Sequence, residues 1–224
     1  MTTAETTRIL IVGVGGLGTA MVHEALERGL TVSVMVRNRD KLDAALDPEA
    51  LGRLAAITVG DATDPDALDR AMTGIDVVLS GNGAHRKMAR SLADAVNRNG
   101  VRKLVWPAGG SNAMEDDGVT PVYKRYLDSW PGVEKVYHAH QVCIDAIRDA
   151  GINYVFFGPG RMAPAGHRSA DVASTVRINR SAGASVSYED AAWVMLEAAT
   201  TSAWDRELVS ASTPSDSDQD DVWK

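Results

Sequence analysis

Short apolar runs alternate along the chain with segments whose apolar positions recur at helical spacing. The runs predict strands at 9–12, 31–36, 55–59, 75–80, 101–106 and 153–157. Helical spacing follows the first run directly and predicts further helices at 64–72, 85–99 and 133–150. Strands and helices that alternate in this way pair the strands in parallel through right-handed crossovers. The pattern therefore predicts a single α/β domain built on a doubly wound parallel sheet.

Two long connections interrupt this alternation, at 108–132 and 158–185. Each follows a predicted strand on the side where such sheets bind ligands, and connections this long tend to be functional or mobile. We therefore expect one domain over 1–211, with a substrate pocket built from both segments. Residues 212–224 form an acidic tail that we expect to be flexible, although Trp223 could dock onto a partner chain.

Composition and charge exclude several classes of partner and site for this chain. The chain has 224 residues and a net charge of −7, which argues against a general nucleic-acid surface. Its single cysteine, Cys143, excludes an intrachain disulfide and a thiol-based zinc cluster. No apolar run has the length of a membrane span or a signal peptide. We expect a cytoplasmic protein that acts on a small molecule, without nucleic-acid or membrane partners, and that could form a homodimer.

A glycine turn separates the first strand from the first helix. Gly13, Gly15 and Gly18 fit the spacing G-x-G-x-x-G. In that pattern the first glycine permits the turn, the second lets a pyrophosphate approach, and the third lets helix and strand pack closely. The helix N-terminus adds unpaired N–H groups and partial positive charge. The motif indicates a dinucleotide site in a Rossmann-type sheet.

The end of the second strand indicates which dinucleotide binds. An acidic residue is usual there for NAD, whereas this chain places Arg37 at the strand end, followed by Arg39 and Lys41. A guanidinium binds a 2′-phosphate through charge-assisted hydrogen bonds, and a carboxylate would repel it. We predict NADP(H) as the cofactor; the alternative is a solvated loop with ordinary surface charge.

Further landmarks follow the glycine turn in a characteristic order. They are Val36-Arg37-Asn38, 59–64 (VGDATD), 79–83 (LSGNG), 158–161 (GPGR) and 186–192 (VSYEDAA). Together they resemble the atypical short-chain dehydrogenase/reductase group called NAD(P)H-binding or NmrA-like, which includes small flavin reductases of the biliverdin reductase B type. The resemblance covers about residues 8 to 200, and it bears on the fold and on NADP binding more than on the reaction.

The resemblance implies a set of cofactor contacts. Those expected around the pyrophosphate are Gly13, Gly15, Gly16, Leu17 and Gly18; around the 2′-phosphate, Arg37 and Arg39; around the adenine, Asp61 and Ala62; around the nicotinamide ribose, Asn82 and Gly83; and beside the nicotinamide, Pro159 and Gly160.

The catalytic residues depart from the usual pattern. Ordinary short-chain dehydrogenases use Tyr-x-x-x-Lys, in which the ammonium lowers the tyrosine pKa, but here Gln141 stands four residues after Tyr137. In flavin-reductase-like members a His or Lys lies eleven residues before the helix-ending glycine, and counting back from Gly151 gives His140. We therefore take His140 as the first candidate for substrate polarisation or proton supply, Tyr137 as the second, and Ser111 as the nearest hydroxyl after the fifth strand. The residue spacing supports no metal site.

Two functions remain open. Hydride transfer to a flavin, quinone or biosynthetic intermediate needs little acid–base help, because the cofactor carries the chemistry. A non-catalytic NmrA-like sensor, which reports the NADP(H) state to a protein partner, would also lack the Tyr/Lys pair. Aromatic and methionine side chains of the long connections could stack on a flat acceptor or form a small core of their own; they are Met114, Tyr123, Tyr126, Trp130 and Met162.

Overall fold

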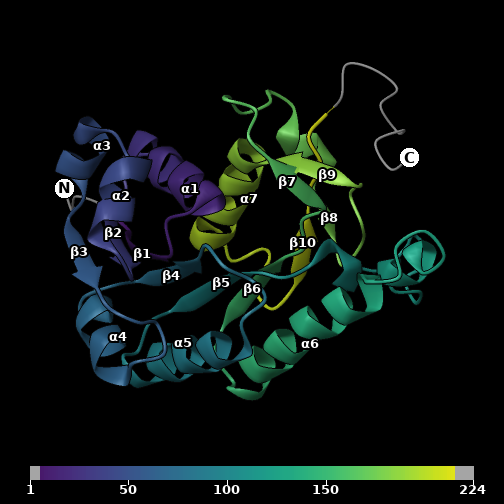
Figure 1. The fold of residues 1–224 in the computed structure, drawn as a ribbon, viewed down its shortest axis with the longest axis horizontal. Helices are drawn as coiled ribbons and strands as arrows, with labels where there is room; N and C mark the ends of the chain where they lie inside the picture. Colours follow the sequence, from purple (N-terminus) through teal and green to yellow (C-terminus); the bar gives the residue numbers. More distant parts are fainter. Residues whose placement is uncertain (1–5, 215–224) are drawn as a thin grey trace.

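The computed structural model describes residues 6–214, in which eight strands form one twisted sheet (Figure 1). The order across the sheet is β3-β2-β1-β4-β5-β6-β10-β8. The strands, in the order of the chain, are β1 Arg8–Val12, β2 Thr31–Val36, β3 Ala56–Val59, β4 Val77–Ser80, β5 Lys103–Pro107, β6 Tyr154–Phe157, β8 Arg177–Ile178 and β10 Leu208–Ser210. All neighbours pair in parallel except β8, which runs antiparallel to β10.

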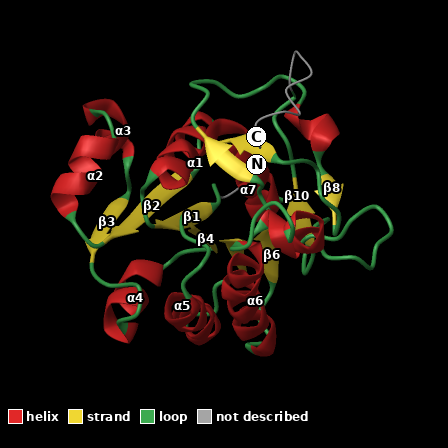
Figure 2. Ribbon diagram, turned by 45° about the vertical axis from the view of Figure 1, so that its right-hand side comes forward, coloured by secondary structure: helices red, strands yellow, loops and turns green. Residues whose placement is uncertain are grey.

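Helices cover both faces of this sheet (Figure 2). Those on one face are α1 Gly16–Glu27, α2 Arg39–Ala45, α3 Pro48–Arg53 and α7 Tyr188–Thr200; those on the other are α4 Pro65–Met72, α5 Arg86–Arg98 and α6 Val133–Asp149. Alternate residues of β1 point into two separate cores: Ile9 and Ile11 toward α1 and α7, Leu10 and Val12 toward α4 and α5. Burial on both faces explains why this strand is continuously apolar. The predicted doubly wound α/β fold is confirmed.

Local sequence sets where the helices begin. Asp64, with Pro65 in the first turn, caps α4 by accepting from the N–H of Asp66 at 3.0 Å. The Nδ1 of His85 accepts from the N–H of Met88 at 3.2 Å at the start of α5. The His85 side chain therefore serves as the N-cap of α5.

The two long connections contain more structure than the sequence indicated. Segment 108–132 holds two short 3₁₀ helices, η1 Gly110–Asn112 and η2 Val122–Tyr126. Segment 158–185 begins with β7 Arg161–Ala163, which pairs in parallel with β9 Ser185–Ser187, and it includes η3 Val172–Thr175 and the edge strand β8. These strands are two or three residues long, too short for apolar alternation to reveal them.

A buried carboxylate fixes the second segment to the domain. Asp190 is fully buried and accepts hydrogen bonds from the N–H and the hydroxyl of Ser169, at 2.7 and 2.8 Å, and from the hydroxyl of Thr213 at 2.7 Å. The neighbouring Glu189 accepts from the N–H groups of Ala165 and Gly166. The start of α7 therefore determines the position of this connection. Of the predicted tail at 212–224, residues 212–214 belong to the described part of the chain. Residues 215–224, with Trp223, lie outside it.

Candidate nicotinamide-cofactor site

The glycine turn lies where the strand order reverses, at the carboxyl end of β1 between β2 and β4. Gly13 has φ = +90°, a left-handed conformation that side chains disfavour, and its N–H donates to the Met35 carbonyl at 2.9 Å. A Cβ on Gly18 would lie 2.1 Å from the Gly13 carbonyl oxygen, and one on Gly81 would lie 2.2 Å from the same atom. These approaches bring α1 and the turn after β4 against the glycine loop.

The N-terminus of α1 fits an anionic group. Gly15 is its N-cap residue and no side chain caps the helix. Space is open beside Gly15, because a Cβ there would meet no atom within 4 Å. Unpaired N–H groups, the helix dipole and free space are together the features of a pyrophosphate site. The residues present therefore fit the phosphates of a dinucleotide. The phenol ring of Tyr188, which the sequence did not single out, covers Gly16, where a Cβ would lie 2.7 Å from its ring.

Arg37 and Asp61 occupy neighbouring strand ends beyond this turn. Val36 pairs with Val59, so the two side chains follow adjacent strands at one edge of the sheet. Hydrogen bonds from Thr63 lower the pKa of the Asp61 carboxyl, and the charge of Arg37 lowers it further. Within 6–214 the Arg37 guanidinium has no hydrogen bond or ion pair, whereas Arg39 forms an ion pair with Asp43 at 2.7 Å. Arg37 is the better placed of the two arginines to bind an incoming phosphate.

A cavity of about 450 Å³ adjoins the turn; we call it the acceptor cavity. Leu17, Gly81 and Gly83 form one side of it. Both long connections contribute to the rest, through Ser111, Tyr126, Trp130, Pro159, Gly160 and Met162. Apolar side chains dominate the lining, and the volume is that of an ordinary small-molecule site. Three of the five aromatic and methionine candidates therefore face the cavity, while Met114 and Tyr123 do not line it.

His140, on α6, lines this cavity and lies close to Gly83 and Gly109. A Cβ on Gly109 would lie 2.8 Å from its Cδ2, and its Nδ1 is buried with no hydrogen-bond partner in the described part of the chain. Burial lowers the pKa of His140, and a contact with the main chain of Gly83 offsets part of that effect. The imidazole is therefore neutral near pH 7.

Tyr137 and Ser111, the other catalytic candidates, lie differently. The Tyr137 ring stacks on Tyr123 with ring centroids 4.2 Å apart and does not line the cavity, and burial raises the pKa of its phenol. Gln141 accepts from Asn112 at 3.1 Å, so the position of the usual lysine serves to anchor η1. Ser111 lines the cavity, and its hydroxyl donates to Asn112 at 3.2 Å. His140 and Ser111 share one cavity, and Tyr137 is separate from it.

Hydrogen bonds and close backbone contacts fix the turns around the cavity. Asn82 is exposed, and its main chain forms two hydrogen bonds with the Ser80 hydroxyl. The Pro159 carbonyl accepts from the N–H of Gly110 at 2.7 Å. A Cβ on Gly160 would lie 2.2 Å from the Ala184 carbonyl oxygen. Ala62 is buried at the start of the segment that leads to α4.

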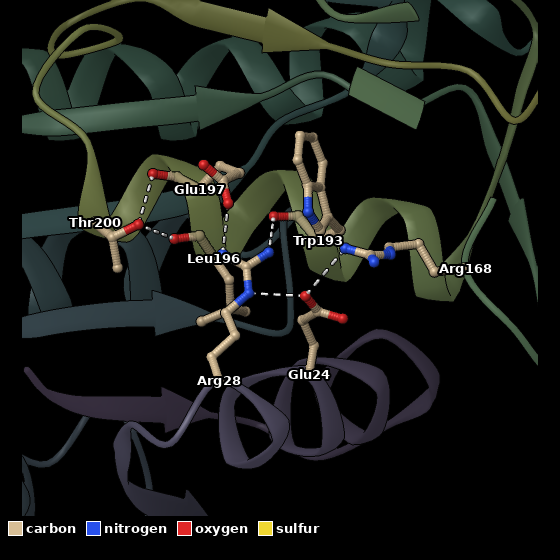
Figure 3. A network of polar contacts seen from close by, with 7 residues as sticks. All are labelled: Glu24, Arg28, Arg168, Trp193, Leu196, Glu197 and Thr200. Carbon is tan, nitrogen blue, oxygen red and sulfur yellow. Dashed lines mark hydrogen bonds and ion pairs between the residues drawn. The ribbon is translucent and has the colours of Figure 1, made fainter. Parts of the chain in front are cut away.

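A second cavity, of about 680 Å³, runs along α1 from Gly15 and Gly16 to Arg168. Figure 3 shows the polar network beside it, which joins α1 to α7. Arg28 bonds Glu24 and Glu197, each at 2.7 Å, and the same Glu24 carboxylate lies 3.7 Å from Arg168. The network stabilises the packing of the two helices that flank the glycine loop.

Within 6–214, no His, Cys, Asp and Glu side chains gather into a cluster suited to a metal ion. No helix in that range is long and apolar enough to cross a membrane.

Comparison with known proteins agrees with this architecture. The closely similar folds include a short-chain dehydrogenase/reductase of Veillonella parvula DSM 2008 (18% identity, 93% of this chain and 95% of that one, TM-score 0.73), also solved in complex with NADP (TM-score 0.72). ChuY, an anaerobillin reductase of Escherichia coli O157:H7, matches with 15% identity over 95% of this chain and all of that one, TM-score 0.69. At these identities the likeness shows the fold.

Sequence comparisons bear on the family. Two Mycobacterium tuberculosis versions of the Trk system potassium uptake protein TrkA are 34% identical over 77 residues. The match spans about a third of this chain and 33% of the length of those relatives. The NAD(P)H-binding family model, by contrast, matches residues 13–202, from the glycine turn to the end of α7. The chain therefore belongs to the NAD(P)H-binding family of Rossmann-type oxidoreductases.

Proposed function

We propose that the protein is an NADPH-dependent reductase of a small planar or carbonyl acceptor, such as a flavin, a quinone or a biosynthetic intermediate. The observation that carries the proposal is the acceptor cavity. It is largely apolar, it adjoins Leu17, Gly81 and Gly83 at the strand ends, and it holds one half-buried imidazole. A flat ring bound there would lie beside the expected nicotinamide position, which is the arrangement that hydride transfer requires.

The roles of the residues follow from their chemistry. A bound NADPH supplies the hydride. The α1 N-terminus holds the pyrophosphate, Asp61 and Ala62 border the adenine, and Asn82, Pro159 and Gly160 border the nicotinamide riboside. Tyr126, Trp130 and Met162 exclude water from the cavity and orient the acceptor ring. The neutral imidazole of His140 donates a hydrogen bond to the acceptor oxygen as negative charge develops there, and Ser111, whose hydroxyl donates to Asn112, lines the same cavity.

Preference for NADPH over NADH rests on Arg37. Its guanidinium is exposed at the end of β2 and lacks an ion pair in the described chain, so it can bind a 2′-phosphate without losing a partner. Arg39 plays a smaller part, because its head group already bonds Asp43.

A sensor without turnover is the second candidate function. One observation favours it: the Tyr137 phenol is stacked on Tyr123 outside the cavity, so that no ordinary short-chain dehydrogenase proton donor faces the acceptor. The cofactor site would be unchanged in a sensor, and the partner would be a protein that distinguishes the NADPH-bound form.

The reductase and the sensor differ in whether bound NADPH is oxidised by an acceptor. Purified protein is mixed with NADPH and a panel of flavins, quinones and carbonyl compounds, and the loss of reduced-nicotinamide absorbance is followed, with Trp130→Ala as a cavity variant. A reductase oxidises NADPH with at least one acceptor, and Trp130→Ala raises KM for that acceptor. Tight NADPH binding without oxidation by any acceptor would reject the reductase in favour of the sensor.

A further inference from the structure

We infer that the acceptor carries an oxyanion, and that Arg161 binds this group at the edge of the acceptor cavity as the residue that sets substrate specificity. The inference rests on the proposed reductase function and adds to it the chemical class of the substrate: a planar, largely apolar body with a carboxylate, sulfonate or phosphate.

The backbone of Arg161 is fixed on both sides. It is the first residue of β7, its N–H donates to the Ala184 carbonyl at 2.8 Å, and it pairs with Ser185 of β9. The next residue, Met162, packs against the core beneath α7 and also lines the cavity. Arg161 is exposed, and it lines the cavity together with Met162, Gly183 and Ala184. A short, well-anchored strand therefore holds Arg161 in the lining of the cavity.

The charge of Arg161 is uncompensated. Within 6–214 its guanidinium has no hydrogen bond and no ion pair, whereas Arg28, Arg98 and Arg125 all bond carboxylates. None of the described residues that line the cavity is an Asp or Glu. His140 is the other basic side chain in the lining, and it is neutral near pH 7. The cavity therefore carries one fixed positive charge in a chain whose net charge is −7.

Such a cavity selects an anion. A guanidinium at an apolar wall binds carboxylate or phosphate through paired, charge-assisted hydrogen bonds, while a cationic acceptor would be repelled.

The acceptor, rather than the cofactor, is the source of the oxyanion. Of the turn residues expected to hold the pyrophosphate, the four glycines do not line the acceptor cavity, and Leu17 is the one that does. The 2′-phosphate has Arg37 at the far end of the cofactor site. Arg161 instead shares its cavity with Tyr126 and Trp130, the aromatic residues expected to contact the acceptor ring.

Two matched pairs of acceptors test the assignment: riboflavin with FMN, and 1,2-naphthoquinone with its 4-sulfonate. The members of each pair share a ring and differ by one anionic group. The ratio of kcat/KM, anionic over neutral, is measured in the wild type, in Arg161→Gln and in Lys124→Gln. The last variant removes a charge from exposed η2 outside the cavity lining and serves as the control. We expect the ratio to fall about tenfold or more in Arg161→Gln, since a charge-assisted bond is lost, and to stay unchanged in Lys124→Gln.

Binding measurements separate failure of this inference from failure of the proposed function. Flavin fluorescence anisotropy reports affinity for FMN and riboflavin without turnover, and an NADPH titration reports the cofactor site. Selective loss of FMN affinity in Arg161→Gln would support the inference even if no acceptor is reduced. An unchanged FMN-to-riboflavin ratio together with weaker NADPH binding would overturn it, because Arg161 would then serve the cofactor. Unchanged ratios with unchanged NADPH binding would overturn it as well.

Discussion

The imidazole of His140 lies directly against the backbone of Gly83: a Cβ on this glycine would stand 3.1 Å from Cε1 of the ring. The same Cβ would lie 2.0 Å from the Pro107 carbonyl oxygen. One residue without a side chain therefore lets the turn after β4, the end of β5 and the middle of α6 meet at the acceptor cavity. The geometry of the proposed catalytic group depends on that contact.

Replacing this glycine is the first prediction. Gly83→Ala forces the turn away from Pro107 and His140, and we expect it to cost about 1–3 kcal/mol of stability, the usual range for overpacking, and to lower kcat/KM. Urea unfolding and acceptor kinetics measure the two effects. Gly52→Ala is the matched control, because Gly52 lies on exposed α3 with no atom within 4 Å of the added Cβ. There we expect a gain of up to about 1 kcal/mol from the helical alanine. Equal stability of the two variants would contradict the close contact at Gly83.

Burial of His140 predicts a pH dependence of stability. Its folded-state pKa lies below that of the unfolded chain, so the unfolded state takes up its proton first as the pH falls. The contribution to stability is complete above the unfolded pKa, about 6.5, and is lost as the pH falls through the folded pKa. Between pH 7 and pH 5 the wild type should therefore lose more unfolding free energy than His140→Gln, in which this titration is absent. Parallel urea curves at both pH values provide the measurement, and identical losses would show that His140 is solvated.

The buried carboxylate of Asp190 predicts a larger effect on stability. Asp190→Ala leaves Ser169 and Thr213 without the acceptor of three hydrogen bonds. Because hydrogen bonds to charged groups contribute about 1.5–3 kcal/mol each, we expect a loss of at least about 2 kcal/mol, and increased proteolysis of segment 158–185. Asp94→Ala is the control: this exposed carboxylate lies 4.0 Å from Arg90, and surface pairs of this kind contribute less than about 1 kcal/mol. A small effect at both positions would mean that the connection is held by other contacts.

The fold could be predicted from the sequence because the patterns that specify its strands and helices are local. The apolar run at 9–12 continues into a glycine turn, and Asp64 and His85 are polar caps directly before apolar periodic segments. Each of these features specifies its own element without distant partners. The succession of strands and helices along the chain could therefore be predicted from the sequence. The position of Arg37 was predictable for the same reason, since it simply ends a strand.

The walls of the acceptor cavity depend on contacts between distant segments. The pairing of β7 with β9 joins Arg161 to Ser185, and β10 is a three-residue strand that pairs with β6. Neither has the length or alternation that predicts a strand. Tyr137 illustrates the same limit for the site. Its place in the sequence matches the tyrosine of the usual motif, but stacking on Tyr123 turns its ring away from the cavity, and no local pattern reports that stacking.

The most direct test of the account is the affinity of the protein for NADPH and NADH, measured by fluorescence titration in the wild type, Arg37→Ala and Arg39→Ala. Both candidate functions, the NADPH-dependent reductase and the sensor, use a cofactor whose 2′-phosphate lies at Arg37. We predict that the wild type prefers NADPH, and that Arg37→Ala weakens NADPH binding about 10- to 100-fold with little change for NADH, as expected for a lost charge-assisted contact. Arg39→Ala should show a smaller loss, because its guanidinium already bonds Asp43. Equal affinities for the two cofactors, unaltered by Arg37→Ala, would show that Arg37 does not bind a 2′-phosphate.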